Sequence, residues 1–360
     1  MHQIIKNIFI LILSFGLLSA FSILAVLWAF SNNLPDYKFL KSYMPSVSSK
    51  VYSGDGELMN VFSAEKRIFV PYNAISEKVI NSFLSAEDKN FYSHPGVDAK
   101  GVLRAVINNI SNILSSKRLE GASTITQQVA KNFLLTNEVS LNRKIKEAIL
   151  AFRIERALSK DRILELYLNQ IYLGGGAYGV ASASLEYFDK SIGELNYEEA
   201  ALLAALPKAP SKYNPYKSIE LAKYRRNLVL KNLYENNYIN KTEYKKFINK
   251  EIILKKRKKT FTEGTSYYVE DIRKNVVDQF GYDKVYKKGL NISTPINLSL
   301  QKIAIKSLRE GLIAYDKRKG WRGPLLRGKK INNWRNKIDI FRLEKSINWN
   351  LAIIKKIDKF

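Results

Sequence analysis

The sequence predicts a mainly α-helical protein that begins with one membrane helix and ends in a smaller α+β segment. Three observations predict this class: an uncharged apolar run near the N-terminus, a long region of helical periodicity, and a final region that mixes strand and helix patterns. The chain has 360 residues, enough for more than one core. It contains no cysteine, which excludes a disulfide framework and a thiol nucleophile.

The apolar run covers residues 8–30, which carry no charge. A helix of this length extends about 35 Å, enough to cross a hydrocarbon core. We interpret it as a retained single-pass anchor behind a cytoplasmic tail of residues 1–7, because a cleaved signal peptide has a shorter apolar region. The formal net charge of +26 favours an anionic partner: lipid, nucleic acid or a phosphate-bearing substrate.

Residues 31–74 predict a polar linker followed by a β-hairpin, because apolar and polar residues alternate around Gly54-Asp55-Gly56. Residues 75–245 are mostly helical in pattern, and residues 246–360 begin as a linker and turn to mixed strand and helix. One helix near the start of the helical region has a continuous apolar side, made by Val102, Leu103, Val106, Ile107, Ile110, Ile113 and Leu114. Such a side belongs to the core or, beside an anchor, rests on lipid.

The stretch "SAEDKNFYSHPG", residues 85–96, contains the first candidate catalytic groups. Helical spacing places Glu87 over Phe83 and Leu84, on the apolar side, with Asp88 next to it. Burial raises the pKa of a carboxylate and suits a general base. Two interpretations of this fragment alone remain open: a general base, or a helix-end acid that reaches back to solvent.

The stretch "EGASTITQQVAKN", residues 120–132, predicts a helix that begins near Ile125 with a capping box formed by Thr124 and Gln127. Thr124, Gln128 and Lys131 then share one side of this helix. A hydroxyl, an amide and an ammonium beside a helix N-terminus suit a phosphate. The alternative is an ordinary capped helix with an exposed lysine.

The stretch "LNRKIKEAILAFRIERAL", residues 141–158, places Arg143 and Glu147 four residues apart. The helix is apolar on both sides, so we expect it to be buried or to line a cleft, with both charged groups away from bulk solvent. The alternative is a surface ion pair.

These three constellations, in this order and spacing, resemble the glycosyltransferase family 51 domain of class A penicillin-binding proteins. The first family motif is matched by Glu87, Asp88, Phe91, His94 and Gly96. The second is matched by Gly121, Ser123, Thr124, Thr126, Gln127, Gln128, Lys131 and Asn132, and the third by Arg143, Lys144 and Glu147. Two further motifs occupy residues 163–188, with Tyr167 and Asn169, and residues 198–215.

The resemblance implies a lysozyme-like domain that polymerises lipid II, releases undecaprenyl pyrophosphate and inverts the anomeric centre. It implies that Glu87 is the general base and that Glu147 assists at the donor pyrophosphate. The implied substrate-binding groups are Thr124, Gln128, Lys131, Asn132, Arg143 and Lys144. The groups implied to support the site structurally are Asp88, Phe91, His94, Gly121 and Ser123.

The resemblance also implies a divalent cation, Mg or Mn, without an assignable ligand set, and no organic cofactor. The implied partners are lipid II, the growing glycan strand, membrane lipid, and a separate transpeptidase or other proteins of cell division and elongation. The implied location is the bacterial inner membrane, with the catalytic domain on its periplasmic or outer face. We expect no nucleic-acid partner, because no aromatic residues interleave the basic run "KKRKK".

Two S-x-x-K tetrapeptides, at Ser63 and Ser299, match the serine motif of transpeptidases, but the chain contains no K-T-G partner. We therefore expect a chain truncated before the transpeptidase domain, without transpeptidase activity. The alternative function is an inactive or scaffolding remnant of a split bifunctional penicillin-binding protein.

Overall fold

The computed structural model describes residues 34–43, 46–63, 66–114, 121–136, 140–255 and 264–320, together with residues 7, 14, 16, 18, 21, 25, 28–31, 138 and 323–324. The chain divides into two units, residues 1–301 and 302–360. Among the residues that the structure describes, no helix is both long and apolar enough to cross a membrane. The span predicted at residues 8–30 lies largely outside the described residues.

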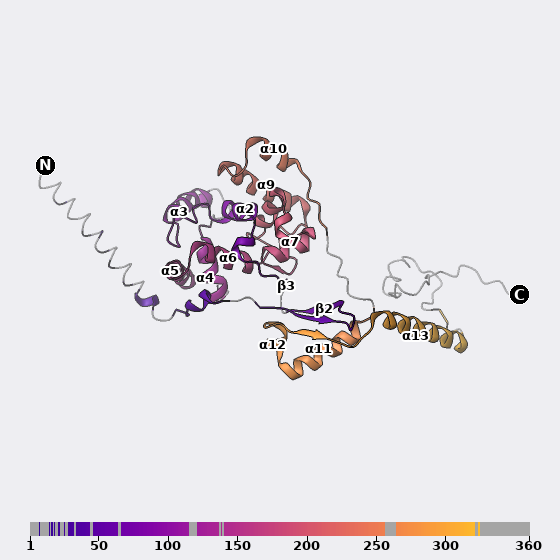
Figure 1. The fold of residues 1–360 in the computed structure, drawn as a ribbon. Helices are drawn as coiled ribbons and strands as arrows, with labels where there is room; N and C mark the ends of the chain where they lie inside the picture. The colour runs from indigo at the N-terminus through magenta and orange to yellow at the C-terminus, as the bar shows by residue number, and fades with distance from the viewer. Residues whose placement is uncertain are drawn as a thin grey trace. The chain divides into compact units, whose positions relative to one another are not determined.

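The helical part of the first unit confirms the mainly α prediction (Figure 1). Its α-helices are α2 (Glu77–Glu87), α3 (Ala99–Leu114), α4 (Ile125–Leu134), α5 (Leu141–Ala157), α6 (Lys160–Gln170), α7 (Val180–Phe188), α8 (Tyr197–Ala205), α9 (Ile219–Glu235) and α10 (Lys241–Asn249). Short 3-10 helices are η1 (Lys38–Lys41), η2 (Tyr72–Ala74) and η3 (Ile192–Glu194), and β3 (Lys66–Arg67) pairs in parallel with β4 (Ala177–Tyr178).

Helix α8 lies inside the helical core. Alanine and leucine fill most of its positions, and every side chain from Ala200 to Ala205 is at most 1% exposed. A helix that is apolar on every side is stable only when other elements surround it. Helices α2 and α9 both pack against α8, so the helix that ends at Glu87 is fixed to the core.

Residues 37–43 differ from the linker predicted for this segment, because they pack on the helical core. Leu40 of η1 is fully buried in it. Arg162 of α6 donates a 2.7 Å hydrogen bond to the carbonyl of Tyr43. The Tyr43 ring meets Phe133 of α4 edge-on, with 4.9 Å between ring centroids. The few apolar and aromatic residues of this short segment show no helical or strand periodicity from which this packing could be predicted.

The predicted hairpin is confirmed. Strand β1 (Ser49–Tyr52) pairs antiparallel with β2 (Leu58–Phe62), and the turn between them contains Gly56 at a φ of +83°. Strand β5 (Asn291–Ser293) pairs in parallel with β1, which gives the order β2-β1-β5. Segments assigned by sequence to the start and to the end of the chain therefore share one sheet.

This sheet has a small core of its own with α11 (Ser266–Phe280) and α12 (Tyr282–Tyr286). The buried residues of that core are Val51, Met59, Phe62, Val269, Val285 and Leu298. The mixture of strand and helix predicted within residues 246–360 is thus present in the described part. The second unit is described from residue 302 to residue 320 and at residues 323–324, and α13 (Leu298–Lys319) runs into it.

The apolar side of α3 is exposed. Val102, Leu103, Val106, Ile107 and Ile110 are between 40% and 63% exposed. The core interpretation is therefore wrong for these residues, because helical periodicity shows which residues share a side and not what covers it. Lipid remains the other predicted contact.

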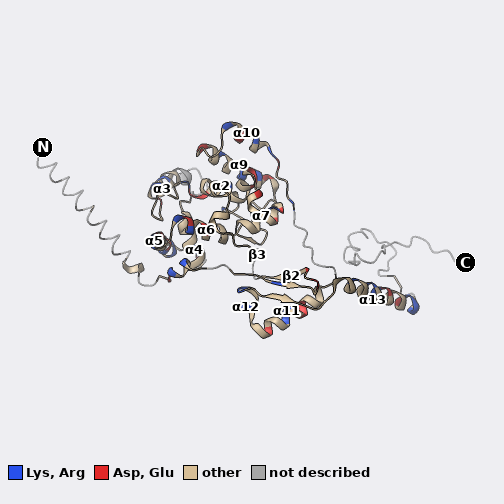
Figure 2. Ribbon diagram, in the orientation of Figure 1, with Lys and Arg blue, Asp and Glu red and all other residues tan. Residues whose placement is uncertain are grey.

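Lysine and arginine are spread over most of the described helices, with acidic residues among them (Figure 2). Most of the basic run at residues 255–259 lies outside the described residues. The excess of positive charge therefore does not by itself mark a site, and a local cluster of cations must be found from geometry.

Candidate active site

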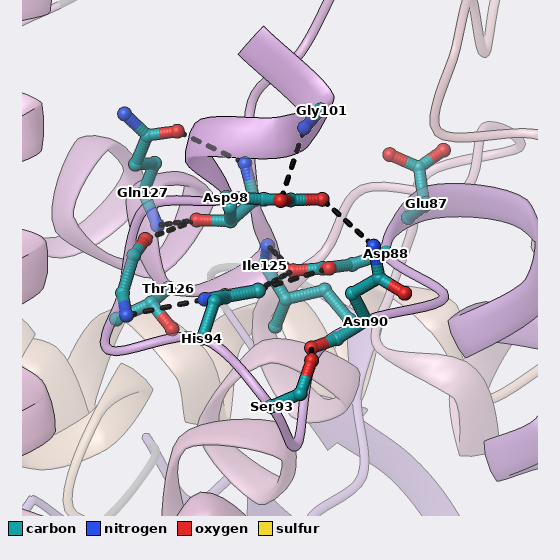
Figure 3. Close-up of polar contacts among 12 residues, drawn as sticks. Glu87, Asp88, Asn90, Ser93, His94, Asp98, Gly101, Ile125, Thr126 and Gln127 are labelled. Atoms are coloured by element: carbon teal, nitrogen blue, oxygen red, sulfur yellow. Dashed lines mark hydrogen bonds and ion pairs between the residues drawn. The ribbon is translucent and has the colours of Figure 1, made fainter. Parts of the chain in front are cut away.

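A network of hydrogen bonds around Asp88 holds the segment that follows α2 (Figure 3). The Asp88 carboxylate accepts hydrogen bonds from His94 Nε2 and from the backbone N–H of Ile125, each at 3.0 Å. The backbone N–H of Gly96 donates to His94 Nδ1 at 3.1 Å, so the ring proton resides on Nε2. Asp88 therefore joins the end of α2 to the first turn of α4.

Thr124 and Gly96 close this network. The Thr124 hydroxyl donates to the Gly96 carbonyl at 2.6 Å and accepts from the Gln127 N–H at 3.2 Å. The Gln127 side chain accepts in return from the Thr124 N–H, which confirms the capping box and the helix start at Ile125. Gly96 has a φ of +102°, and a Cβ there would lie 2.8 Å from the carbonyl of Ala151. Only glycine fits this position without strain.

Phe91 anchors the same loop from inside. Its side chain is fully buried, and Lys160 Nζ lies 4.5 Å from the centroid of its ring. Lys160 also donates a 2.7 Å hydrogen bond to the His94 carbonyl. The structure thus places Asp88, Phe91 and His94 in the support of the loop.

Glu87 lies outside the Asp88 network (Figure 3). Gln128 Nε2 donates a 2.8 Å hydrogen bond to Glu87 Oε2. Burial is the largest influence on the pKa of Glu87 and raises it, whereas the Gln128 hydrogen bond and the cations Arg225 and Lys208 act in the opposite direction. A partly buried carboxylate with a raised pKa has the properties of a general base.

Glu87 lines two cavities. The first has a volume of about 480 Å³, and its polar lining includes Asp88, Asp98, Arg104, Asn232 and Asn236. The second has a volume of about 290 Å³ and is lined by five cationic side chains: Lys131, Arg143, Lys144, Lys208 and Arg225. Among the described residues, Glu87 and Glu147 are the only carboxylates in that second lining. This cavity suits an anion, and it lies directly beside the candidate base.

Glu147 holds two of these cations. Its side chain on α5 is 3% exposed, with Lys144 Nζ at 2.7 Å from Oε2 and Arg143 Nε at 3.5 Å from Oε1. Lys144 Nζ also donates to Ser123 Oγ at 2.6 Å. The predicted arrangement, with Arg143 and Glu147 away from bulk solvent, is present in the structure.

The surroundings of Glu147 do not fit a protein-held divalent cation. Among the described residues, no group of three or more acidic or histidine side chains is close enough to hold a metal ion. The two side chains nearest to the Glu147 carboxylate are cations, which repel a metal.

The structure brings most of the predicted residues to the two cavities. Gly121 and Ser123 line both, Thr124 lines the first, and Gln128 and Lys131 line the second. The Thr124 hydroxyl is already engaged by Gly96 and Gln127. Asn132 is exposed and lines neither cavity.

The sequence did not indicate Lys208 and Arg225 as site residues. Lys208 lies in the fifth motif, for which the resemblance implies no role, and Arg225 is followed by a second arginine on α9. Arg226 is 1% exposed and bonds to the Ile248 carbonyl, whereas Arg225 lines the second cavity. The arginine pair by itself does not show which member lies beside Glu87.

Asn232 on α9 and Asn236, the residue that follows this helix, also hold the end of α2. Asn232 Nδ2 donates to the Ser85 carbonyl at 2.9 Å, and Asn236 Nδ2 donates to Ser85 Oγ at 3.2 Å. Helix termini leave carbonyls without helical partners, and Asn232 satisfies one of them. Helix α9 therefore contributes to the walls of both cavities and fixes the turn that carries Glu87.

The fold and the site together define a helical protein that places a carboxylate of raised pKa beside a cation-lined cavity. The family model described as Transglycosylase matches residues 55–234, and the chain belongs to this family. The family resemblance predicted from the sequence is thereby confirmed.

The chain is similar to curated proteins named Penicillin-binding protein 1A. The one from Rickettsia felis is 48% identical over 314 residues, which are 87% of this chain and 40% of that protein. The one from Aquifex aeolicus is 48% identical over 280 residues, 78% of this chain and 38% of that protein. The crystal structure of Penicillin-Binding Protein 1A from Haemophilus influenzae matches with a TM-score of 0.50 and 28% identity, over 85% of this chain and 36% of that one. The chain spans about two-fifths of the length of these curated relatives.

Proposed function

We propose that the chain is a peptidoglycan glycosyltransferase that polymerises lipid II into glycan strands. The observation that carries this proposal is the position of Glu87, on the wall that two cavities share, with five cations in one of them. A sugar transfer that expels pyrophosphate needs a base for the acceptor hydroxyl and cations for the leaving group. Membership of the transglycosylase family supports the same reaction.

In the proposed reaction, Glu87 is the general base. Its carboxylate takes the proton of the acceptor 4-hydroxyl while the hydroxyl oxygen attacks the anomeric carbon of the donor. The bond from that carbon to the phosphate oxygen breaks, and undecaprenyl pyrophosphate leaves with the electron pair. A single displacement of this kind inverts the anomeric centre. Gln128 orients the base through its 2.8 Å hydrogen bond.

The second cavity is the proposed pyrophosphate site. Lys131, Arg143 and Lys144 would neutralise the developing negative charge, together with Lys208 and Arg225 of the same lining. Glu147 would assist by keeping Arg143 and Lys144 on the cavity wall, since its carboxylate accepts a hydrogen bond from Lys144 and forms an ion pair with Arg143. Thr124 would contribute indirectly, because its hydroxyl bonds to Gly96 and to the first turn of α4 and so holds both in place.

We propose that the enzyme acts at the bacterial inner membrane, with its catalytic part on the periplasmic or outer face. The apolar span predicted at residues 8–30 and the exposed apolar side of α3 support this location. Its proposed partners are lipid II, the growing glycan strand, membrane lipid and a transpeptidase that cross-links the product.

Polymerisation of lipid II by the full chain in detergent tests the proposed function. Glu87→Gln should lower the rate by at least about a hundredfold, because a general base contributes a factor of this order. Glu220→Gln, an exposed acid in the first turn of α9, should leave the rate unchanged. Normal polymerisation by Glu87→Gln would contradict the assigned base. Binding of lipid II by the wild-type chain without any turnover would instead favour the scaffolding alternative.

A further inference from the structure

Tyr167, on α6, has a buried hydroxyl that none of the assigned roles uses. Its side chain is 1% exposed, and its hydroxyl has no hydrogen-bond partner among the described residues. An O–H group buried without a partner costs free energy, so a tyrosine at such a position needs a reason. Phenylalanine would fill the same space without that cost.

The ring of Tyr167 packs on the side of α2 that carries Glu87. It meets Phe83 edge-on, with ring centroids 6.2 Å apart. Phe83 lies one helical turn before Glu87, so the two side chains share one side of the helix. Burial, then the negative charges of Glu87 and Asp88, raise the pKa of Tyr167. The phenol therefore stays protonated and available as a donor beside two carboxylates.

Of these two carboxylates, Glu87 has more capacity to accept. Asp88 already accepts from His94 and from the Ile125 N–H. Glu87 receives one hydrogen bond from the described residues, from Gln128 to Oε2. A charged, partly buried carboxylate is stabilised by two or more donors.

We propose that Tyr167 is a positioning residue for Glu87. Whenever Glu87 is charged, the Tyr167 hydroxyl donates a hydrogen bond to Oε1, the carboxylate oxygen that Gln128 does not use. The bond would hold the carboxylate toward the shared wall of the two cavities. It would also favour the charged, proton-accepting form of Glu87 over the neutral form. This inference rests on the proposed function only in treating Glu87 as the base.

The groups that act on the pKa of Glu87 come from several elements: Gln128 on α4, Arg225 on α9, Lys208 after α8 and Asp88 at the end of α2. The proposal adds Tyr167 on α6, whose own pKa the charge of Glu87 raises. Removing one donor to the charged form raises the pKa of the carboxylate. As the solution is acidified, Glu87 of such a variant becomes protonated, and therefore inactive as a base, at a higher pH than in the wild-type chain.

The test is the pH profile of kcat/KM for lipid II polymerisation by Tyr167→Phe. We expect its acid limb to move upward by about half to one pH unit, so that kcat/KM on the limb falls about three- to tenfold and recovers at higher pH. Tyr187→Phe is the matched control: Tyr187 is also fully buried, but its hydroxyl donates to the Leu173 carbonyl at 2.9 Å. This control should lower the melting temperature and leave the acid limb in place.

A second measurement does not use activity. Carbon-13 NMR of side-chain carboxyls, with the Glu87 signal assigned by its loss in Glu87→Gln, gives the pKa of Glu87 directly. An upward shift in Tyr167→Phe supports the inference, and an unchanged midpoint together with an unchanged acid limb overturns it. If Glu87→Gln polymerises normally, the proposed function fails, and the NMR titration still decides whether Tyr167 donates to Glu87.

Discussion

Gln128 Nε2 lies 2.8 Å from Glu87 Oε2 and joins the second turn of α4 to the last residue of α2. The capping box at Thr124 fixes where α4 begins, and Asn232 fixes the end of α2. The direction of the Glu87 carboxylate therefore depends on two helix ends, each held by its own side-chain bonds. The same hydrogen bond favours the charged carboxylate and opposes the effect of burial on its pKa.

Gln128→Met should move the acid limb of the pH profile of kcat/KM toward higher pH. Methionine has a similar length and cannot donate, so the pKa of Glu87 rises further above its ordinary value. Because the deprotonated base is the active form, kcat/KM on the acid limb should fall about tenfold and recover as the pH is raised. Initial rates of lipid II polymerisation across pH measure this. A uniform loss at every pH would show that Gln128 acts on the substrate instead of on Glu87.

Glu147→Gln should weaken substrate binding more than it slows the chemical step. The substitution removes the charge that holds Lys144 at 2.7 Å and Arg143 at 3.5 Å, so both cations become free to leave the cavity wall. We expect KM to rise about tenfold, a loss of about 1.4 kcal/mol. Glu310→Gln, in an exposed pair 3.9 Å from Lys306, is the control and should change nothing. A lower kcat with an unchanged KM would place Glu147 in the chemical step.

The sequence predicted which residues lie at the site better than it predicted the role of each residue there. Periodicity placed Glu87 on an apolar side, and the capping pattern located the start of α4. Local patterns could not separate Glu87 from Asp88, because their partners come from elsewhere: the bond from Asp88 to the Ile125 N–H crosses 37 positions. Family motifs separated them, and the structure shows how their hydrogen bonds differ.

Long-range pairing explains what the sequence could not predict in the fold. The hairpin was predictable because its strands and turn are contiguous, whereas its pairing with β5 joins Lys50 to Asn291. No local pattern contains that register. The exposure of one side of α3 could not be predicted for the same reason, since a periodic apolar pattern does not show whether another element will cover it.

Gly96→Ala should destabilise the protein by about 1–3 kcal/mol, the cost of a strained backbone position. Gly96 has a φ of +102°, and an added Cβ would lie 2.8 Å from the Ala151 carbonyl. Gly193→Ala is the matched control, because nothing lies within 4 Å of a Cβ at that position. Denaturant unfolding of both variants measures the difference. Equal stability of the two variants would contradict the assigned role of Gly96 in the loop.

Substitutions on the exposed side of α3 should lower the polymerisation rate in a bilayer but not in detergent. Leu103 and Ile107 are 63% and 59% exposed, so the double substitution to serine should leave the melting temperature nearly unchanged. If this side rests on lipid, the substitution removes apolar area that holds the catalytic part against the bilayer. Polymerisation of lipid II embedded in vesicles should then fall several-fold, while the rate in detergent micelles stays the same. A large loss of stability would show that α3 packs on protein. Equal rates in vesicles would show that this side does not contact lipid during the reaction.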